Sequence, residues 1–144
     1  MGILAEIEIV RELGREYWGS LGLEGEFQNF EEEVASLPGV YCRLLVARVE
    51  GEAAGTVALR PLGEGACEMK RLYVRPGYRG RGLARKLVED ALGEARGMGY
   101  REVFCDTLPS MGAALGLYRS MGFGETGAYS EDATPGAIFL RRAV

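Results

Sequence analysis

The sequence predicts an α/β fold of the α+β type, in which helices cover both faces of a mixed central β-sheet. The first observation is a hairpin signal, Glu50-Gly51-Glu52, between two predicted strands. The second is the strand–helix–strand–helix order that follows the hairpin, which is typical of a mixed sheet covered by helices. A length of 144 residues with 47% hydrophobic residues suits a single domain over residues 1–144.

The expected helices follow from apolar residues at helical spacing and from the residues that end each helix. Pro38-Gly39 ends the second helix, and Gly97 ends the third. Ser110 is a candidate cap for the fourth helix, and Gly122 stands at its end. The helices are expected over residues 7–20, 27–37, 82–96 and 111–121. The strands are expected over residues 43–49, 53–60, 67–74, 101–107, 123–129 and 137–142, with a turn over residues 61–65.

The most informative segment is residues 72–84, where an apolar strand enters a short loop rich in Gly and Arg and a helix follows at once. This order directs backbone N–H groups and a helix N-terminus toward one point, and both favour a phosphate group. Of 17 basic residues, 7 lie between Lys70 and Lys86, in a chain of net charge −4. A ligand that carries a diphosphate is the simple interpretation.

Two common phosphate motifs are excluded. The dinucleotide fingerprint needs a third Gly where Arg85 stands, and the P-loop needs a Gly-Lys-Ser/Thr that the sequence lacks. The remaining pattern, Arg79-x-x-Gly82-x-Ala84, resembles the acetyl-CoA signature R/Q-x-x-G-x-G/A of the GNAT superfamily of N-acetyltransferases. Residues 68–74 upstream and residues 117–123 downstream are similar to two further family motifs, so the resemblance spans roughly residues 44–123 in the family's order.

The resemblance implies the GNAT fold, which usually opens with a strand before its first helix. Only residues 3–8 are available for that strand here, so it is expected to be stunted or absent. The resemblance also implies that acetyl-CoA binds at the loop. Backbone N–H groups would surround the pyrophosphate, and the strand before the loop would bind the pantetheine arm where the family's sheet splays. The cofactor-binding residues are then expected to be Leu72, Tyr73, Val74, Arg79, Gly80, Arg81, Gly82, Leu83 and Ala84. The alternatives are a solvated basic turn and an ordinary buried strand.

Transfer of an acetyl group to an amine needs a base, because an alkyl ammonium of pKa ~10.4 is almost wholly protonated at pH 7. Glu68 is the first candidate, since some family members use a Glu at this strand position. Residues 68, 70, 72 and 74 are expected to share one face of their strand. Ordered water is the alternative base, and a carboxylate paired across strands is the alternative role for Glu68.

Tyr118 resembles the family's Tyr that protonates or steadies the departing thiolate. A phenol of pKa ~10 is close enough to a thiol of pKa ~8.5 for direct donation. The alternative is a half-buried Tyr that packs beside Phe123. Because the family transfers the acetyl group directly in a ternary complex, Cys105 is expected to be a core residue and no nucleophile.

The acceptor side is less defined. Nine Glu and two Arg lie within residues 1–36, and a negative wall there would attract a cationic amine. A solvated helix face is the alternative explanation. Phe27 and Gln28 are candidates to line the acceptor pocket, and Asp106 is a second candidate base or acceptor contact.

Composition excludes several classes of function. The chain has no His, so a Ser-His or Cys-His catalytic pair is impossible. Its three cysteines lack metal spacing and indicate buried thiols in a reducing cytoplasm, without a bound metal. No membrane helix, secretory signal or extended basic track is visible, so neither a membrane nor a nucleic acid is an expected partner. A homodimer is compatible with the sequence.

The sequence therefore predicts a cytoplasmic, acetyl-CoA-dependent N-acetyltransferase that acts on a primary amine of a small molecule or peptide. The alternative from a different class is a non-catalytic acyl-CoA-binding or sensing module. Such a module needs the loop but neither Glu68 nor Tyr118.

Overall fold

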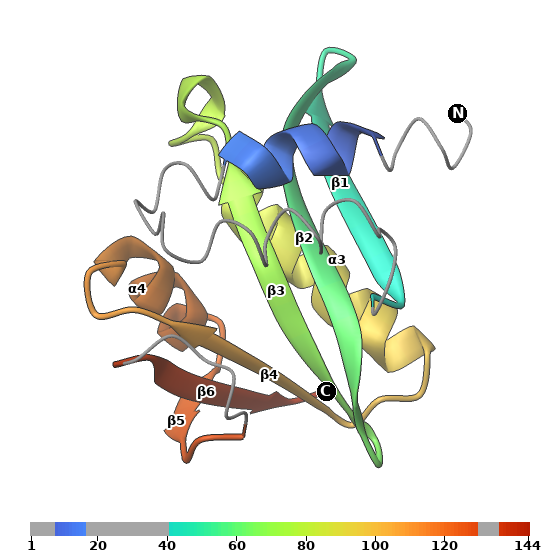
Figure 1. Ribbon diagram of the computed structural model, residues 1–144, viewed down its shortest axis with the longest axis vertical. Coiled ribbons are helices and arrows are strands. Elements are labelled where there is room, and N and C mark those ends of the chain that lie inside the picture. The colour runs from blue at the N-terminus through green and yellow to red at the C-terminus, as the bar shows by residue number, and fades with distance from the viewer. Residues whose placement is uncertain (1–7, 17–40, 130–135) are drawn as a thin grey trace.

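The computed structural model describes residues 8–16, 41–129 and 136–144. Within them a mixed six-stranded sheet has the order β1-β2-β3-β4-β6-β5. The strands are β1 (Arg43–Val49), β2 (Glu52–Gly63), β3 (Ala66–Val74), β4 (Glu102–Thr107), β5 (Gly124–Thr126) and β6 (Ile138–Ala143). The helices are residues 8–16, α3 (Leu83–Gly97) and α4 (Gly112–Ser120), with a 3-10 turn, η2 (Pro76–Tyr78), after β3. The helix over residues 8–16 and α3 lie on opposite faces of the sheet, which confirms the predicted fold class (Figure 1).

The main hydrophobic core lies between the sheet and α3. The apolar stripe that predicts this helix is buried, as Leu87, Val88, Ala91, Leu92 and Ala95. It packs against Val57, Leu59 and Met69 of the sheet, and α4 joins the same core through Tyr118. Each large apolar side chain buried in this way contributes roughly 1.5–3 kcal/mol, so the layer holds α3 and the loop before it on the sheet.

The central strands β3 and β4 are parallel, but they pair only over a short stretch. Their register runs from Ala66 opposite Glu102 to Glu68 opposite Phe104. Beyond that point β4 continues to pair with β6, up to Thr107, while β3 continues along β2. The two strands therefore diverge and open a V-shaped gap in the sheet (Figure 1).

A β-bulge interrupts β3 at Arg71, whose φ angle of 59° lies in the left-handed region. Lys70 pairs with Ala58 and Tyr73 pairs with Thr56, so two residues of β3 lie opposite one residue of β2. A left-handed φ is uncommon for a residue other than Gly, and it marks the point where the strand changes direction.

The bulge reverses which side chains of β3 face α3. Met69 before it and Val74 after it both belong to the core, although strict alternation would put them on opposite faces. The prediction that residues 68, 70, 72 and 74 share one face is therefore wrong beyond residue 70, because the extra residue shifts the alternation by one. Glu68 and Tyr73 consequently face away from α3.

Some boundaries differ from the sequence prediction. β2 continues through Pro61, where the sequence predicts a turn. Pro61 is tolerated because β1 begins opposite Leu59, so no residue of β1 lies opposite residue 61 and none needs its N–H. β5 is shorter than the predicted strand over residues 123–129. The predicted helix over residues 27–37, and residues 3–7 of the doubtful first strand, lie outside the described residues. Glu8 is helical.

No helix in the described part of the chain is both long and apolar enough to cross a membrane.

Gly55 provides a test of the close approach between β2, β3 and α3. A Cβ at this position would lie 2.7 Å from the backbone oxygen of Tyr73 and 3.1 Å from Leu87 Cδ1. We expect Gly55→Ala to lower the free energy of unfolding by about 1–3 kcal/mol, because backbone cannot yield as a side chain can.

The control is Gly93→Ala on the exposed side of α3, where a Cβ would meet nothing within 4 Å. This change should raise the free energy of unfolding by about 0.5–1 kcal/mol, since Ala is the better helix former. Urea denaturation measures both values. Equal effects of the two substitutions would contradict the packing described for Gly55.

Candidate active site

A pocket of about 490 Å³ lies at the open end of the V, between the end of β3, the loop before α3, and α4. Most residues that the sequence predicts for the cofactor line it: Leu72, Tyr73, Val74, Arg79, Gly80, Gly82, Leu83 and Ala84. Arg81 does not line this pocket, and its guanidinium lies over the Tyr78 ring at 5.6 Å. The wall opposite the loop comes from α4, through side chains that include Ala114 and Leu117.

The loop between β3 and α3 depends on two glycines in the left-handed region. Gly80 has a φ of 81° and Gly82 a φ of 77°. A Cβ at either position would meet nothing within 4 Å, so the backbone is open on that side. Gly82 is the N-cap of α3 and supplies no capping side chain. The first N–H groups of α3 therefore remain available as donors beside the pocket, as an anionic ligand requires.

Arg79 ties the loop back to β3. Its Nε donates a hydrogen bond to the Val74 carbonyl oxygen at 2.9 Å, and its guanidinium lies over the Tyr73 ring at 5.7 Å. These contacts fix a positive charge at the rim of the pocket, where the sequence predicts one.

Glu68 lies on the sheet face away from α3, and its side chain is only 1% exposed. Its Oε1 accepts a hydrogen bond from Arg60 Nε at 2.6 Å, and its Oε2 accepts one from the Tyr129 hydroxyl at 2.6 Å. Lys70 Nζ lies 3.8 Å from the same Oε2. Burial and the bond to Glu68 raise the pKa of Tyr129 well above its ordinary value, so this phenol remains a donor. Both oxygens of Glu68 are therefore engaged.

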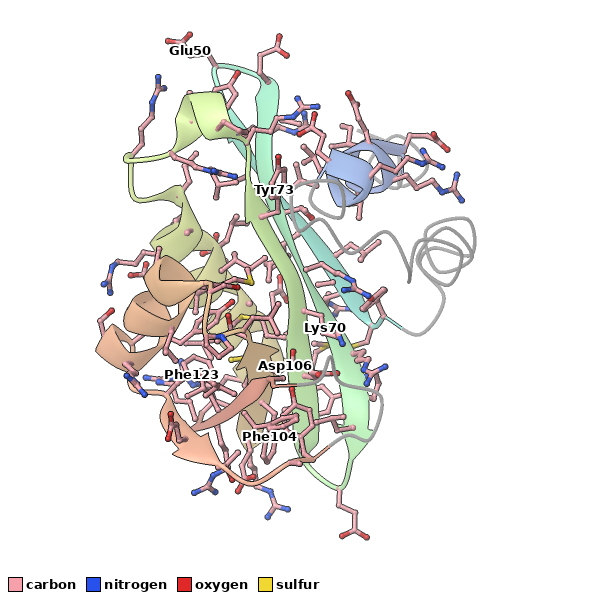
Figure 2. The ribbon with its side chains drawn as sticks, turned by 60° about the vertical axis from the view of Figure 1, so that its left-hand side comes forward. Glu50, Lys70, Tyr73, Phe104, Asp106 and Phe123 are labelled. Carbon is pink, nitrogen blue, oxygen red and sulfur yellow. The ribbon has the colours of Figure 1, made fainter. Side chains whose placement is uncertain are left out.

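Asp106 lies on the same face of the sheet, in the part of β4 that has left β3. Burial raises the pKa of its carboxyl group, Lys70 lowers it, and Glu68 raises it. Figure 2 shows Lys70 and Asp106 near the point where the strands diverge. Unlike Glu68, Asp106 has no ion pair with any side chain of the described residues.

Tyr118 is buried in the core, 6% exposed, with its ring centroid 5.7 Å from that of Phe123. Its helix neighbours Ala114 and Leu117 line the pocket, whereas Tyr118 does not. The acceptor candidates Phe27 and Gln28 lie outside the described residues.

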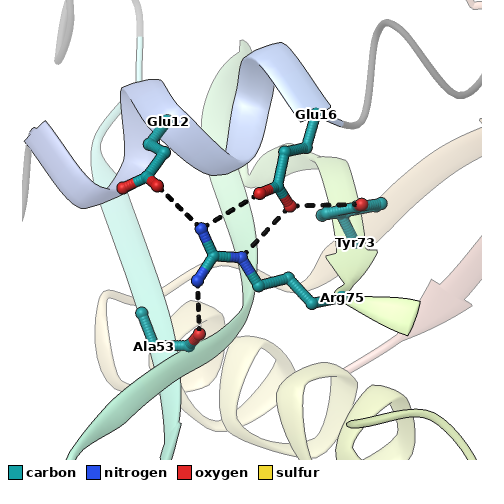
Figure 3. Close-up of polar contacts among 5 residues, drawn as sticks. All are labelled: Glu12, Glu16, Ala53, Tyr73 and Arg75. Carbon is teal, nitrogen blue, oxygen red and sulfur yellow. Dashed lines mark hydrogen bonds and ion pairs between the residues drawn. The ribbon is translucent and has the colours of Figure 1, made fainter. Parts of the chain in front are cut away.

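The first helix is held to the end of β3 by an arginine (Figure 3). Arg75 Nη2 lies 2.9 Å from Glu12 Oε1 and 3.0 Å from Glu16 Oε1, and its Nη1 donates to the Ala53 carbonyl oxygen at 3.2 Å. The Tyr73 hydroxyl donates to Glu16 Oε2 at 3.3 Å. This network fixes the strand immediately before the loop.

The same network weakens the electrostatic argument for a cationic acceptor. Glu12 and Glu16 are compensated by Arg75, and Glu8 pairs with Arg11. The described part of the acidic N-terminal region is therefore largely neutralised, and its attraction for a cation is correspondingly small.

The buried thiols are poor nucleophiles. Burial raises the pKa of Cys67 to about 12 and raises that of Cys105 further. A thiolate is the reactive form, so neither is suited to carry an acetyl group. Within the described ranges, no cluster of three His, Cys, Asp or Glu side chains could hold a metal ion.

Sequence reasoning missed Arg60, Tyr129 and Arg75. Arg60 and Tyr129 contact Glu68 across 8 and 61 positions of the chain, and Arg75 contacts Glu12 across 63. Nothing local in the sequence marks such contacts.

Comparison with known proteins identifies the family. The sequence model of the acetyltransferase (GNAT) family matches residues 7–123. The chain belongs to the GNAT family. An uncharacterised N-acetyltransferase of Schizosaccharomyces pombe is 37% identical over 142 residues, which cover 94% of this chain and 87% of the relative.

Solved structures show the same fold at low identity. A GNAT acetyltransferase from Staphylococcus aureus has a TM-score of 0.78 at 18% identity, over 92% of each chain. A PaiA N-acetyltransferase from Thermoplasma acidophilum, solved with coenzyme A, has a TM-score of 0.76 at 18% identity, over 97% of this chain and 94% of that one. The GNAT fold expected from the sequence is thus confirmed.

Proposed function

We propose that this GNAT protein is an acetyl-CoA-dependent N-acetyltransferase that moves the acetyl group to a primary amine of a small molecule or peptide. The observation that carries the proposal is the pocket at the open end of the V, with a glycine-rich loop on one side and α4 on the other. Its relatives are named N-acetyltransferases, and the T. acidophilum protein of the same fold binds coenzyme A.

The chain offers suitable partners to each part of acetyl-CoA. The N-terminus of α3 and the loop before it supply N–H donors, and Arg79 supplies positive charge, for the pyrophosphate. The edge of β3 that faces the gap, from Leu72 to Val74, has no partner strand there among the described residues. The Val74 carbonyl oxygen already accepts from Arg79, and an amide-bearing pantetheine arm would satisfy the remaining backbone groups.

In this proposal the acetyl group passes directly from acetyl-CoA to the amine, without a covalent intermediate on the protein. The amine nitrogen attacks the thioester carbonyl, a C–N bond forms, and the C–S bond breaks. The ammonium proton passes to a carboxylate or to ordered water, and Glu68 and Asp106 are the two candidate carboxylates. Tyr118 is proposed to steady or protonate the departing thiolate, as the family resemblance implies, and its helix neighbours Ala114 and Leu117 line the pocket.

A non-catalytic acyl-CoA-binding or sensing module is the second candidate. It is favoured by the observation that both oxygens of Glu68 are hydrogen-bonded and that Tyr118 is buried in the core.

The three cysteines are free, which is compatible with the proposed cytoplasmic location. Neither membrane nor nucleic acid is a proposed partner, and a homodimer is compatible with the proposal.

Acetyl-CoA should bind with an affinity that falls as salt concentration rises, because the phosphate contacts are partly ionic. Gly82→Asp should weaken binding at least tenfold, about 1.4 kcal/mol, by placing a carboxylate beside the pyrophosphate. Isothermal titration calorimetry measures both effects.

The matched control is Gly99→Asp at the other end of α3, where φ is 90° and a Cβ would meet nothing within 4 Å. It introduces the same charge and similar backbone strain away from the pocket, so affinity should be preserved. If Gly82→Asp bound acetyl-CoA as tightly as the wild type, the assignment of the loop would be lost.

Release of free thiol from acetyl-CoA should be stimulated by primary amines and not by hydroxyl or carboxylate compounds. A panel of monoamines, polyamines, amino acids and peptides tests this, with each product confirmed by mass spectrometry. Turnover restricted to acceptors without an amine would refute N-acetylation. Tight binding of acetyl-CoA without turnover of any acceptor would favour the sensing module.

Tyr118→Phe should leave acetyl-CoA affinity within about threefold of wild type and lower kcat about 10²-fold. The ring keeps its contact with Phe123, so only the hydroxyl is lost. Steady-state kinetics with an acceptor found in the panel measures the change. An unchanged kcat would show that Tyr118 serves only in packing.

A further inference from the structure

Four charged side chains from three strands, and one tyrosine, meet on the sheet face away from α3, at the point where β3 and β4 diverge. We call this group the sheet-face cluster: Arg60 of β2, Glu68 and Lys70 of β3, Asp106 of β4, and Tyr129 after β5. The two carboxylates of the cluster have different surroundings. Comparison of these surroundings indicates which of them can react.

Glu68 sits where the sheet is still closed. It pairs in register with Phe104, the last pair of the parallel ladder. Its side chain is 1% exposed and accepts two hydrogen bonds of 2.6 Å. A proton placed on Oε1 would face the Arg60 N–H, which cannot accept a hydrogen bond, and a proton placed on Oε2 would require the Tyr129 hydroxyl to reverse its hydrogen bond. At 1% exposure, the side chain also offers an incoming amine almost no accessible surface.

Asp106 sits two residues farther along β4, where the ladder to β3 has ended. It is only partly buried, and none of the described side chains forms an ion pair with it. Asp106 lies where the V-shaped gap begins to open, on the face of the sheet away from α3. Asp106 does not itself line the pocket, so the acceptor amine would have to reach the thioester from this face of the sheet.

We propose that Asp106 is the catalytic base that holds the acceptor amine and takes its proton, and that Glu68 is a positioning residue. The inference rests on the proposed N-acetyltransferase function. Glu68 fixes Arg60 and Tyr129 by its two hydrogen bonds, and it lies close enough to Asp106 to act on that carboxyl group electrostatically. Tyr129 in turn packs between Phe104 and Phe139, with ring centroids 5.1 and 5.2 Å away.

The proton balance is as follows. One proton passes from the substrate ammonium to the Asp106 carboxylate and later to solvent. The neutral nitrogen then attacks the thioester carbonyl, so that a C–N bond forms and the C–S bond breaks. The second nitrogen proton is lost as the amide forms, and the departing thiolate takes up one proton to become the thiol.

The groups that face Asp106 determine how it titrates. From β3 these are Glu68, Lys70 and Arg71, and β6 places the uncharged Phe139 opposite it. The other titratable neighbours are Cys105 of β4 and Tyr129 after β5. Burial and the Glu68 charge raise its pKa, whereas the charges of Lys70 and Arg71 lower it. Removal of the Glu68 charge should therefore move the titration of Asp106 to lower pH without abolishing it.

The experiment measures kcat/KM against pH, with an acceptor amine identified in the panel, for four variants. Asp106→Asn should lower kcat/KM at pH 7 about 10²-fold, and the defect should shrink at a pH where the amine deprotonates unaided. Asp106→Glu keeps a carboxylate and should restore part of the rate. Glu68→Gln should stay within about tenfold of wild type on its plateau, with the acidic limb moved to lower pH.

The matched control is Glu102→Gln, on the same strand and paired with Arg141 on the surface. Its pH profile should equal that of wild type. Acetyl-CoA affinity, measured for every variant, reports whether the cofactor pocket is intact. If Asp106→Asn does not fold, the Asp106→Glu and Glu68→Gln profiles decide between the two carboxylates.

Three results would overturn the inference. Full activity of Asp106→Asn would show that this carboxylate takes no proton. Loss of the acidic limb in Glu68→Gln would make Glu68 the base. A wild-type enzyme that acetylates no amine would refute the proposed function, and this inference with it, whereas either of the first two results leaves the proposed function intact.

Discussion

The separation of β3 from β4 is the constraint on which the rest of the structure depends. Each strand is held on its outer side by another partner, because β4 pairs with β6 as far as Thr107 and β3 pairs with β2 as far as Val74. Arg75 reinforces the second attachment, since its N–H donates to the Ala54 carbonyl oxygen and its side chain to that of Ala53. The strands cannot close on each other, so backbone groups on the inner edge of β3 stay available to a ligand that carries amides.

Because of the bulge at Arg71, the two ends of β3 direct their side chains to different surroundings. Before the bulge, the strand presents Glu68 to the sheet-face cluster. After it, Val74 packs toward α3, and Tyr73 turns toward the first helix. An uninterrupted strand would bring Val74 to the polar face instead. The bulge therefore lets one strand contribute to the polar sheet-face cluster and, a few residues later, to the apolar core beneath α3.

Local sequence signals predicted much of this arrangement. The loop over residues 79–84 and the apolar stripe of α3 lie in continuous segments, and the bounds predicted for β1 agree with the structure. The bulge had no such signal, because Arg71 is not the Gly that a left-handed φ favours. The hydrogen-bond partners of Glu68 could not be predicted from the sequence either, since the bond from Tyr129 joins residues 61 positions apart. Contacts of that kind depend on the register of the sheet, which a single sequence does not reveal.

The contrast between the two carboxylates follows from the same geometry. Where the sheet is closed, water is excluded, and an ionised side chain persists only if its oxygens are hydrogen-bonded, as those of Glu68 are. Such a group holds its donors in place and leaves little of its own surface open to a substrate. Where the strands part, water and ligands can enter, and Asp106 keeps its oxygens available at the cost of partial desolvation. The position at which β3 leaves β4 thus decides which carboxylate is structural and which can react.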